Sequence, residues 1–472
     1  MGAVNIFNTG KSGLFASRTA LATTGHNIAN VNTEGYSRQR VETVANDPVY
    51  LGQLSLGSGV RINQIHRIND EFLAKQISNE AKYLGQYEEK DVALAQAENI
   101  FNEVTNDGLN RLMVRFFNEW RKLGNEPESE SLRATVRENA EQLVGDFHRI
   151  ARSMEDVQKN IDVRIEANVR EANELIQRIA GLNQQIKEDE LRGSAVADLK
   201  DSRDNAVKKL ATILDISSAT NEKGELTISI RNAGPVISGH LFNKLSTHAR
   251  KADPAMGVPD GSLDVILDAA ANSVVTGKIQ NGKLGGLIDA RDRIIAEAVQ
   301  RVDLLAFTFV TKINDIHSSG FSLNNTTGVN FFEQPDVVAG SASNMKVSKA
   351  VRYDANNIAT AIAPDSPGDN RLVQMIAGLQ HQRTMSDGST TFDDHYNATV
   401  ATLATETQKN RHVLEHQSSI LNQLEKFRES ISGVSLDEET TNLIQYQHAF
   451  DASAKVIKVA DEILDTVLSL KR

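Results

Sequence analysis

Prolines are unevenly placed along this chain, and their placement limits what it can fold into. Six of the eight prolines lie between residues 235 and 367, whereas residues 128–234 and 368–472 contain none. Proline removes a backbone hydrogen-bond donor and clashes with the preceding turn of a helix. Long helices are therefore expected in the two proline-free stretches, with an interrupted region between them.

The interrupted region contains a strand pattern. Leu226, Ile228 and Ile230 alternate with polar residues, which is the period of a half-buried strand. The dipeptide Asn281-Gly282 is typical of a tight hairpin turn. We therefore expect a mainly α chain with a small β domain at residues 224–283 inserted between its helices.

The proline-free stretches carry helical stripes. One runs from Ile165 to Ile186 and another from Leu403 to Leu424, both in alternating steps of 3 and 4 residues. This spacing lets a stripe follow a partner helix with little drift. Aromatic residues make up only 5% of the chain, which favours long helices packed through small and aliphatic side chains. An elongated bundle of long helices is the expected shape.

The extreme ends of the chain carry the same spacing. Leu14, Leu21 and Ile28 belong to an N-terminal stripe. A C-terminal stripe contains Leu443, Tyr446, Phe450, Ile457 and Leu464. Because chain ends normally fray, apolar stripes at both ends predict that the terminal helices pair as a coiled coil and bury surface against neighbouring copies. Two ordinary surface helices on a globular core remain an alternative on periodicity alone.

Composition excludes several classes of function. A net charge of -11 disfavours sequence-independent binding to nucleic acid, which needs a basic field. The chain has no cysteine, which excludes disulfides, thiolate metal sites and a cysteine nucleophile. Its first residues lack the pattern of a cleaved signal peptide, and its longest apolar run, residues 304–310, is too short to cross a membrane. Export, if it occurs, would use a route that cleaves no signal.

An abrupt change of pattern follows the N-terminal stripe, in the stretch TGHNIANVNTEGYSRQR. Asparagine tolerates the left-handed conformation that ends helices, so the first helix should stop near Asn30. Residues 32–35 should then form a turn with Gly35 at positive φ. After this turn, three side chains would share one strand face: Tyr36, Arg38 and Arg40.

Three asparagines in this stretch can satisfy the backbone groups that the bend frees, or bridge to another chain: Asn27, Asn30 and Asn32. We interpret the stretch as a rigid elbow between an assembly helix and the next domain. A plain surface turn is the alternative.

One string suggests catalysis. His412, Glu415 and His416 have the H-x-x-E-H spacing of an inverted zinc-protease motif. The string lies inside the stripe that ends at Leu424, and no third metal ligand is identifiable. We therefore expect no enzymatic activity, no metal and no cofactor.

Two motifs carry a resemblance to a known family. ANVNTEGYSRQ, at residues 29–39, resembles the N-terminal signature of the rod, hook and hook-associated proteins of the bacterial flagellum. ISGVSLDEETTNLIQYQHAFDASAKVIKVADEILDTVLSL, at residues 431–470, is similar to the C-terminal segment of the same family. The GYSRQ and SGVSLDEE details resemble the members that form the junction between hook and filament. A hook or distal-rod protein is the alternative, and a free-standing coiled-coil scaffold would not explain both motifs.

The resemblance implies a structural protein that assembles helically into a short tube, connecting hook to filament and buffering their different mechanical states. It also implies export through the flagellar type III pathway and an extracellular location on the flagellum. The implied partners are other copies of the chain, the hook protein, a second junction protein on the flagellin side, and an export chaperone at the C-terminal region. No nucleic acid and no membrane insertion are expected.

The resemblance also implies an assembly interface and a division into domains. The interface would contain both terminal stripes and these elbow residues: Asn27, Ile28, Ala29, Asn30, Asn32, Gly35, Tyr36, Arg38 and Gln39. Three domains are expected: residues 1–50 with 433–472 as a terminal coiled coil, 51–223 with 284–320 and 368–432 as a long-helix bundle, and 224–283 with 321–367 as a β-rich outer domain.

Overall fold

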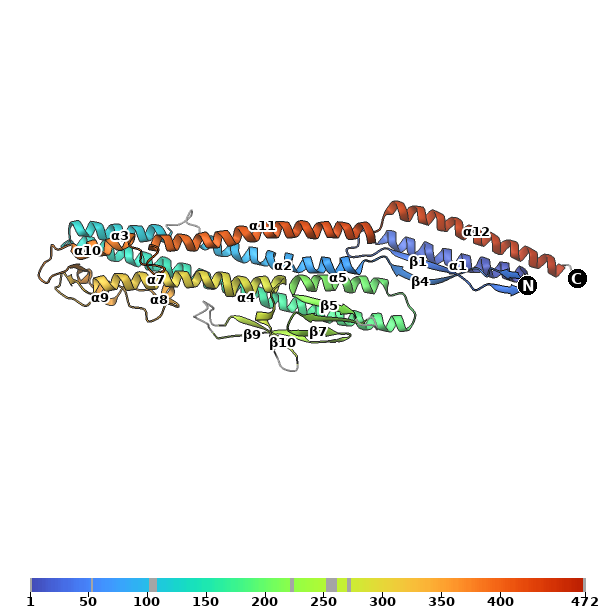
Figure 1. Ribbon diagram of the computed structural model, residues 1–472, viewed down its shortest axis with the longest axis horizontal. Coiled ribbons are helices and arrows are strands. Elements are labelled where there is room, and N and C mark those ends of the chain that lie inside the picture. Colours follow the sequence, from blue (N-terminus) through green and yellow to red (C-terminus); the bar gives the residue numbers. More distant parts are fainter. Residues whose placement is uncertain are drawn as a thin grey trace.

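The computed structural model describes residues 2–51, 54–101, 108–220, 225–251, 261–269 and 273–469. The molecule is elongated, with long helices side by side along its axis and both chain ends at the same end (Figure 1). Small sheets lie against the helices rather than between them. This confirms the predicted mainly α fold with an inserted β region.

Six long helices form the body of the molecule: α2 (Glu71–Ile100), α3 (Leu109–Asn125), α4 (Glu130–Leu191), α5 (Ala197–Ile213), α7 (Ala296–His317) and α11 (Phe392–Ser432). Helix α4 is 62 residues long and lies wholly within the first proline-free stretch. It begins where the Ser129 hydroxyl accepts a hydrogen bond from the backbone N–H of Leu132, which satisfies one of the free donors of the first turn. Its buried apolar side chains recur along the side packed against α3 and α5.

Two small sheets pack on α4: a four-stranded sheet in the order β5-β6-β7-β8 and a three-stranded sheet in the order β11-β10-β9. Their strands are β5 (Ile216–Thr220), β6 (Leu226–Ile230), β7 (Gly234–Ser238), β8 (Leu241–Phe242), β9 (Lys244–Ala249), β10 (Leu263–Asp268) and β11 (Ser273–Val274). Leu226, Ile228 and Ile230 are buried while the residues between them are partly exposed, as the alternation predicted. The sheets begin at Ile216, before the expected boundary.

The predicted turn at Asn281-Gly282 is wrong. Asn281 directly precedes helix α6 (Gly282–Asp289). Gly282 has a φ of 77°, and a Cβ atom there would lie 2.6 Å from the carbonyl oxygen of Ile213. Gly282 is therefore needed as the first residue of a helix that packs closely on the end of α5. The dipeptide alone does not distinguish this role from a hairpin turn.

Residues 321–367 were expected in the β-rich outer domain, but they lie at the end of the molecule away from the chain termini (Figure 1). They form β12 (Phe321–Ser322), α8 (Ser341–Asn344), α9 (Lys349–Tyr353) and β13 (Ala359–Ala361), and α10 (Arg371–Gly378) follows. The physical reason is aromatic packing. Phe331 and Phe332 are fully buried against Phe116, Trp120 and Phe309 of the bundle, which removes a large apolar area from water.

The terminal part combines two helices and a β ribbon. Helices α1 (Gly2–Ala29) and α12 (Leu436–Ser469) lie side by side in opposite directions. Strand β1 (Gln39–Ala45) pairs antiparallel with β4 (Val60–Arg67), and the ribbon packs on α1. The ribbon ends in a hairpin of β2 (Val49–Leu51) and β3 (Leu54–Leu56). Strand β4 therefore belongs with the terminal helices, although residues from 51 onward were expected in the bundle.

Candidate assembly interface

The predicted pairing of the terminal helices is present, and small residues make it close. A Cβ atom on Gly10 would lie 2.8 Å from Cγ1 of Ile457, and one on Gly13 would lie 2.8 Å from Oγ of Ser453. A side chain at either position would require Ile457 or Ser453 of α12 to shift. Glycine in a helix interior costs stability, and here it permits contact between the two helices.

The predicted seam side chains are only half buried in a single chain. This group contains Leu14, Leu21, Ile28, Leu443, Tyr446, Phe450, Ile457 and Leu464. The apolar side chains that are fully buried in this part are small: Ala16, Ala20 and Ala460. The helix pair therefore leaves much of its larger apolar surface open to solvent.

Further apolar side chains of the terminal helices are exposed, and the sequence interpretation did not include them. Phe15 of α1 is 62% exposed, and Val456, Val459 and Ile463 of α12 are also exposed, although Val456 lies beside Gly10 of α1. The last three follow steps of 3 and 4 residues, so they share one helix face. Their spacing could have revealed them, but it does not say which of two apolar faces stays uncovered.

Asn27 is the centre of the elbow. Its side chain is 1% exposed. Its Nδ2 donates to the carbonyl oxygen of Gln39 (2.9 Å) and to Oε2 of Glu439 (3.1 Å), while its Oδ1 accepts from the backbone N–H of Gln39 (3.0 Å) and the hydroxyl of Tyr36 (2.8 Å). All these partners belong to the same chain, so Asn27 and Gln39 join α1, the ribbon and α12.

The turn forms as the sequence predicted. Helix α1 ends at Ala29, Asn30 Nδ2 donates to the carbonyl of His26 (3.0 Å), and Gly35 has a φ of 82°. Ala29 and Asn32 are exposed, while Asn30 and Gly35 are half buried. Ala29 and Asn32 are therefore the elbow residues most available to another chain.

The predicted strand face of Tyr36, Arg38 and Arg40 is wrong, because β1 begins only at Gln39. Arg38 instead pairs through Nε with Oε1 of Glu439 (2.6 Å), and its backbone N–H donates to the carbonyl of Ser432 (2.8 Å). Burial raises the pKa of Tyr36, and the nearby carboxylates of Asp198, Asp201 and Glu439 raise it further. The turn thus places Tyr36 near carboxylates of α5 and Arg38 against α12, whereas Arg40 lies exposed in β1.

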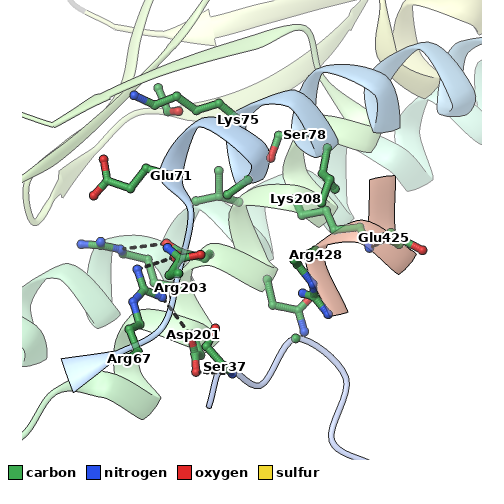
Figure 2. Close-up of a pocket in the computed structure, with 18 of the residues that line it drawn as sticks. Ser37, Arg67, Glu71, Lys75, Ser78, Asp201, Arg203, Lys208, Glu425 and Arg428 are labelled. Atoms are coloured by element: carbon green, nitrogen blue, oxygen red, sulfur yellow. Dashed lines mark hydrogen bonds and ion pairs between the residues drawn. The ribbon is translucent and has the colours of Figure 1, made fainter. Parts of the chain in front are cut away.

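A polar joint connects the terminal part to the bundle and borders a cleft of about 180 Å³ (Figure 2). Asp201 of α5 accepts from the backbone N–H of Ser37 (2.9 Å) and from Nη1 of Arg67 (2.8 Å), and Nη2 of Arg67 lies 2.7 Å from Oδ2 of Asp204. Burial raises the pKa of Asp201, while Arg67 and Ser37 act in the opposite direction. Sequence reasoning missed this joint, because Asp201 is far from the elbow along the chain.

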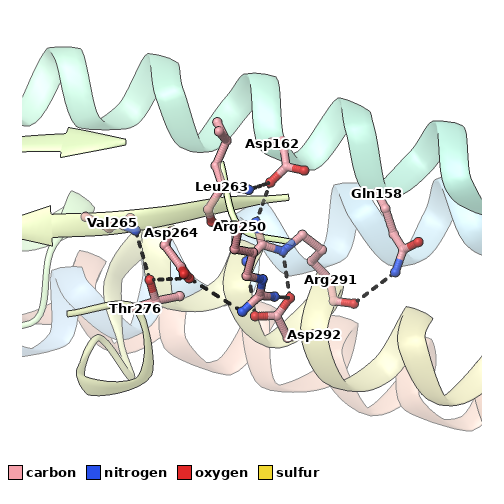
Figure 3. A network of polar contacts seen from close by, with 9 residues as sticks. All are labelled: Gln158, Asp162, Arg250, Leu263, Asp264, Val265, Thr276, Arg291 and Asp292. Carbon is pink, nitrogen blue, oxygen red and sulfur yellow. Dashed lines mark hydrogen bonds and ion pairs between the residues drawn. The ribbon is translucent and has the colours of Figure 1, made fainter. Parts of the chain in front are cut away.

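A second network fixes the sheets to the helices (Figure 3). Arg291, with no exposed side-chain surface, pairs with Asp162 of α4, contacts Asp292 through Nε (2.7 Å), and donates to the carbonyl of Leu263 (2.8 Å). Arg250 at the end of β9 also reaches Asp292 (2.7 Å). The ion pairs offset the cost of burying the Arg291 charge, and the contacts of Arg291 join the sheet strand at Leu263 to α4.

The described residues provide no group of three or more histidine, aspartate or glutamate side chains placed to hold a metal ion. His412, Glu415 and His416 lie exposed on α11. Among the described helices, none is long and apolar enough to cross a membrane. The structure thus offers assembly surfaces and joints as its candidate functional features.

Comparison with known proteins first defines the class. Residues 7–36 match the family model described as flagella basal body rod protein, and residues 428–470 match the C-terminal model of flagellar basal body rod FlgEFG proteins. Both matches fall on the terminal helices and the elbow. The chain is a flagellar protein of the class that shares these two terminal segments.

Three further matches identify the family. Residues 94–332 match the helical domain of flagellar hook-associated protein FlgK. The chain is 30% identical to flagellar hook-associated protein 1 of Bacillus subtilis over 98% of this chain and 97% of that protein, and 24% identical to the Escherichia coli protein of the same name over 99% and 100%. It belongs to the family of flagellar hook-associated protein 1, FlgK. The flagellar hook junction protein FlgK from Burkholderia pseudomallei shares the fold, with a TM-score of 0.67 at 13% identity over 76% of this chain and 100% of that one.

Proposed function

We propose that this chain is a structural subunit of the junction between the flagellar hook and filament, which connects the two and buffers their different mechanical states. The observation that carries the proposal is the terminal helix pair, whose large apolar side chains stay half buried or exposed in a single chain. Such surface is unfavourable in water unless another subunit covers it. Membership of the FlgK family supports the same role.

The joints suit a subunit that transmits torque. Arg67, Asp201 and Ser37 hold the ribbon to α5, and Arg38 with Glu439 holds the elbow to α12. Paired, partly buried charges resist reorientation because separating them leaves charge without a partner. We assign the terminal helices and ribbon to the central tube and the bundle and sheets to its outside. In this assignment the predicted interface residues divide into joint residues such as Asn27 and surface residues such as Ala29 and Asn32.

The proposed partners are neighbouring copies of the chain, the hook protein on one side and a second junction protein on the flagellin side. Contacts between copies must be head-to-tail, because self-complementary faces close instead of extending a helical array. We further propose export through the flagellar type III pathway, with a chaperone at the C-terminal region. The exposed apolar face of α12 supports a need for protection before assembly. No catalytic role is assigned.

A hook or distal-rod protein would share the terminal segments, since rod-protein models match both ends. The helical-domain match over residues 94–332 favours the junction instead.

Deletion of the gene in the source bacterium tests the proposal. We expect electron microscopy to show hooks without filaments and assays of the medium to show lost flagellin. Restoring the gene should restore filaments. Missing hooks would move the protein to the rod or hook, and unaltered flagella would reject the proposed function.

A further inference from the structure

The terminal part of the molecule, which comprises α1, the β ribbon and α12, meets the bundle without a shared hydrophobic core. Among the residues that the structure describes, both clusters of packed apolar side chains lie between Leu73 and Leu424. The terminal part therefore contributes to neither cluster. Relative movement is expected where two parts of a chain lack a large apolar interface, so this joint is a place where the molecule can bend.

The chain crosses the joint at two places that lie side by side. One crossing connects β4 to α2 at residues 68–70, and the other connects α11 to α12 at residues 433–435. The backbone of Arg38 links the two crossings, because its N–H donates to the carbonyl of Ser432 (2.8 Å) and its carbonyl accepts from the N–H of Ile68 (2.8 Å). We call the two crossings and the Arg38 backbone between them the pivot.

Three aspartates of α5 hold the terminal part against the bundle. Asp198, Asp201 and Asp204 are spaced three residues apart, so they lie along one face of the helix. Together they contact four residues of the elbow and the ribbon: His26, Ser37, Gln39 and Arg67. We call these three aspartates the latch. The contacts of the latch are hydrogen bonds and ion pairs.

The cleft of about 180 Å³ lies between the latch and the end of α11. Arg67 and Asp201 lie on one side of it, and Glu425 and Arg428 of α11 lie on the other (Figure 2). Helix α11 leads directly into the pivot at Ser432. Rotation of the terminal part about the pivot would therefore change the width of this cleft without breaking apolar packing, and the contacts of the latch would oppose that rotation.

We infer that the joint is a hinge, in which the terminal part rotates about the pivot and the latch fixes one angle until its contacts separate. The inference deepens the proposed buffering role and rests on it for the use of the hinge in the junction. A hinged subunit can change the angle between its two parts while each part keeps its own packing. The latch suits such release, because Asp204 is 35% exposed and water can replace its partner Arg67 when the pair separates.

Distances between spin labels test the hinge in the purified full chain, which has no cysteine of its own. His448→Cys on α12 and Leu191→Cys at the end of α4 place one label on each part, both at exposed positions. In this background, Asp198→Asn/Asp201→Asn/Asp204→Asn removes the charges of the latch and keeps the size of the side chains. By double electron–electron resonance we expect a narrow distance distribution with the natural latch and a broader, shifted one in the variant.

Two further variants show whether the latch itself is responsible. Arg67→Gln removes the cation that pairs with two of the aspartates, so it should also broaden the distribution. Glu166→Gln/Glu171→Gln/Glu174→Gln removes the same amount of charge from exposed positions on α4. This matched control should leave the distribution narrow. Equal broadening in the control would overturn the inference, because the effect would then follow from net charge.

Labels placed within one part show whether that part stays folded. The pair Lys11→Cys and Gln445→Cys spans α1 and α12, and the pair Val163→Cys and Leu191→Cys spans α4, all at exposed positions. Both pairs should give the same distance distribution with the natural latch and in Arg67→Gln. Broadening within either part would overturn the inference, since loss of folding rather than rotation would then separate the labels.

Two results between the parts would also overturn the hinge. One is an unshifted, narrow distribution between residues 191 and 448 when the latch is removed, and the other is a broad distribution when the natural latch is present. Either result would leave the proposed function intact, because the measurements use the purified chain. Gene deletion tests that function separately, and unaltered flagella in the deletion strain would reject it without any bearing on rotation at the joint.

Discussion

The two ends of the molecule bury different kinds of side chain. Large aromatic side chains are buried at the end away from the termini, whereas small side chains are buried at the end that carries the termini. Phe116, Trp120 and Phe331 pack ring against ring with no exposed surface. In the terminal helices, Ala20 and Ala460 are buried while Phe15 is exposed. A single chain therefore buries its large side chains at the first end and leaves larger apolar surface uncovered at the second. Four measurements test this difference between the two ends.

The largest expected effect on the isolated chain is at Trp120. Trp120→Ala should lower the free energy of unfolding of this end by about 4 kcal/mol, since it removes a fully buried indole and leaves a cavity. Urea unfolding followed by circular dichroism measures it. Phe15→Ala is the control at the other end, with an expected change within about 0.5 kcal/mol. Similar losses for both variants would contradict the proposed difference between the two ends.

His317, in the same aromatic end, should make stability depend on pH. Its Nδ1 donates to the carbonyl of Val329 (2.7 Å) and its Nε2 accepts from the N–H of Ala359 (2.9 Å). Burial lowers its pKa to about 4, and the charge of Arg133 acts in the same direction. The unfolded chain therefore binds an extra proton between about pH 6.5 and pH 4, so the free energy of unfolding should fall by about 3 kcal/mol as the pH drops through that range.

The fluorescence of Trp120, the single tryptophan, can follow this transition because its ring lies 6.3 Å from that of His317. His317→Gln keeps a donor and an acceptor but does not titrate. Between pH 6.5 and pH 4 its free energy of unfolding should therefore fall by about 3 kcal/mol less than that of the natural chain. An unchanged pH profile in the variant would show that other groups control the acid sensitivity.

A smaller effect is expected at the elbow. Asn27→Ala should lower the free energy of unfolding by about 2 kcal/mol, because Glu439 and the backbone of Gln39 lose buried hydrogen-bond partners. Amide hydrogen exchange of residues 30–40 and 432–440 should speed up. Asn32→Ala, at an exposed asparagine of the same turn, is the matched control and should change exchange little. Equal exchange in both variants would mean that Asn27 does not hold the joint.

The smallest effect on the isolated chain is expected at Leu464, whose side chain is only half buried. Leu464→Asp should lower the free energy of unfolding by about 1 kcal/mol. In the assembled flagellum the same change should prevent incorporation, since the charge must be desolvated against a neighbour. Immunoblots of isolated flagella, compared with urea unfolding of the purified variant, measure both. Normal secretion and incorporation would show that the terminal seam is misassigned.

Local sequence patterns predicted the helices and the turn correctly, but they did not predict which segments these elements pack against. The long α4 follows from a proline-free stretch and the end of α1 from Asn30 and Gly35, because these preferences act within a few residues. The predicted strand face at Tyr36 was wrong, because the Tyr36 hydroxyl donates to Oδ1 of Asn27 before the strand begins. The predicted position of residues 321–367 in the outer domain was wrong for a similar reason, because Phe331 packs on residues about 200 positions earlier in the chain.

The amino-acid sequence predicts the long helices, the end of the first helix and the apolar stripes at both chain ends, because spacing and backbone preference are local properties. Three features follow only from the folded chain: Asn27 joins segments of its own chain, Asp201 meets Arg67 beside the elbow, and particular apolar faces remain uncovered. Those features depend on groups far apart in sequence being brought together by the packing of the whole chain, which no local pattern records.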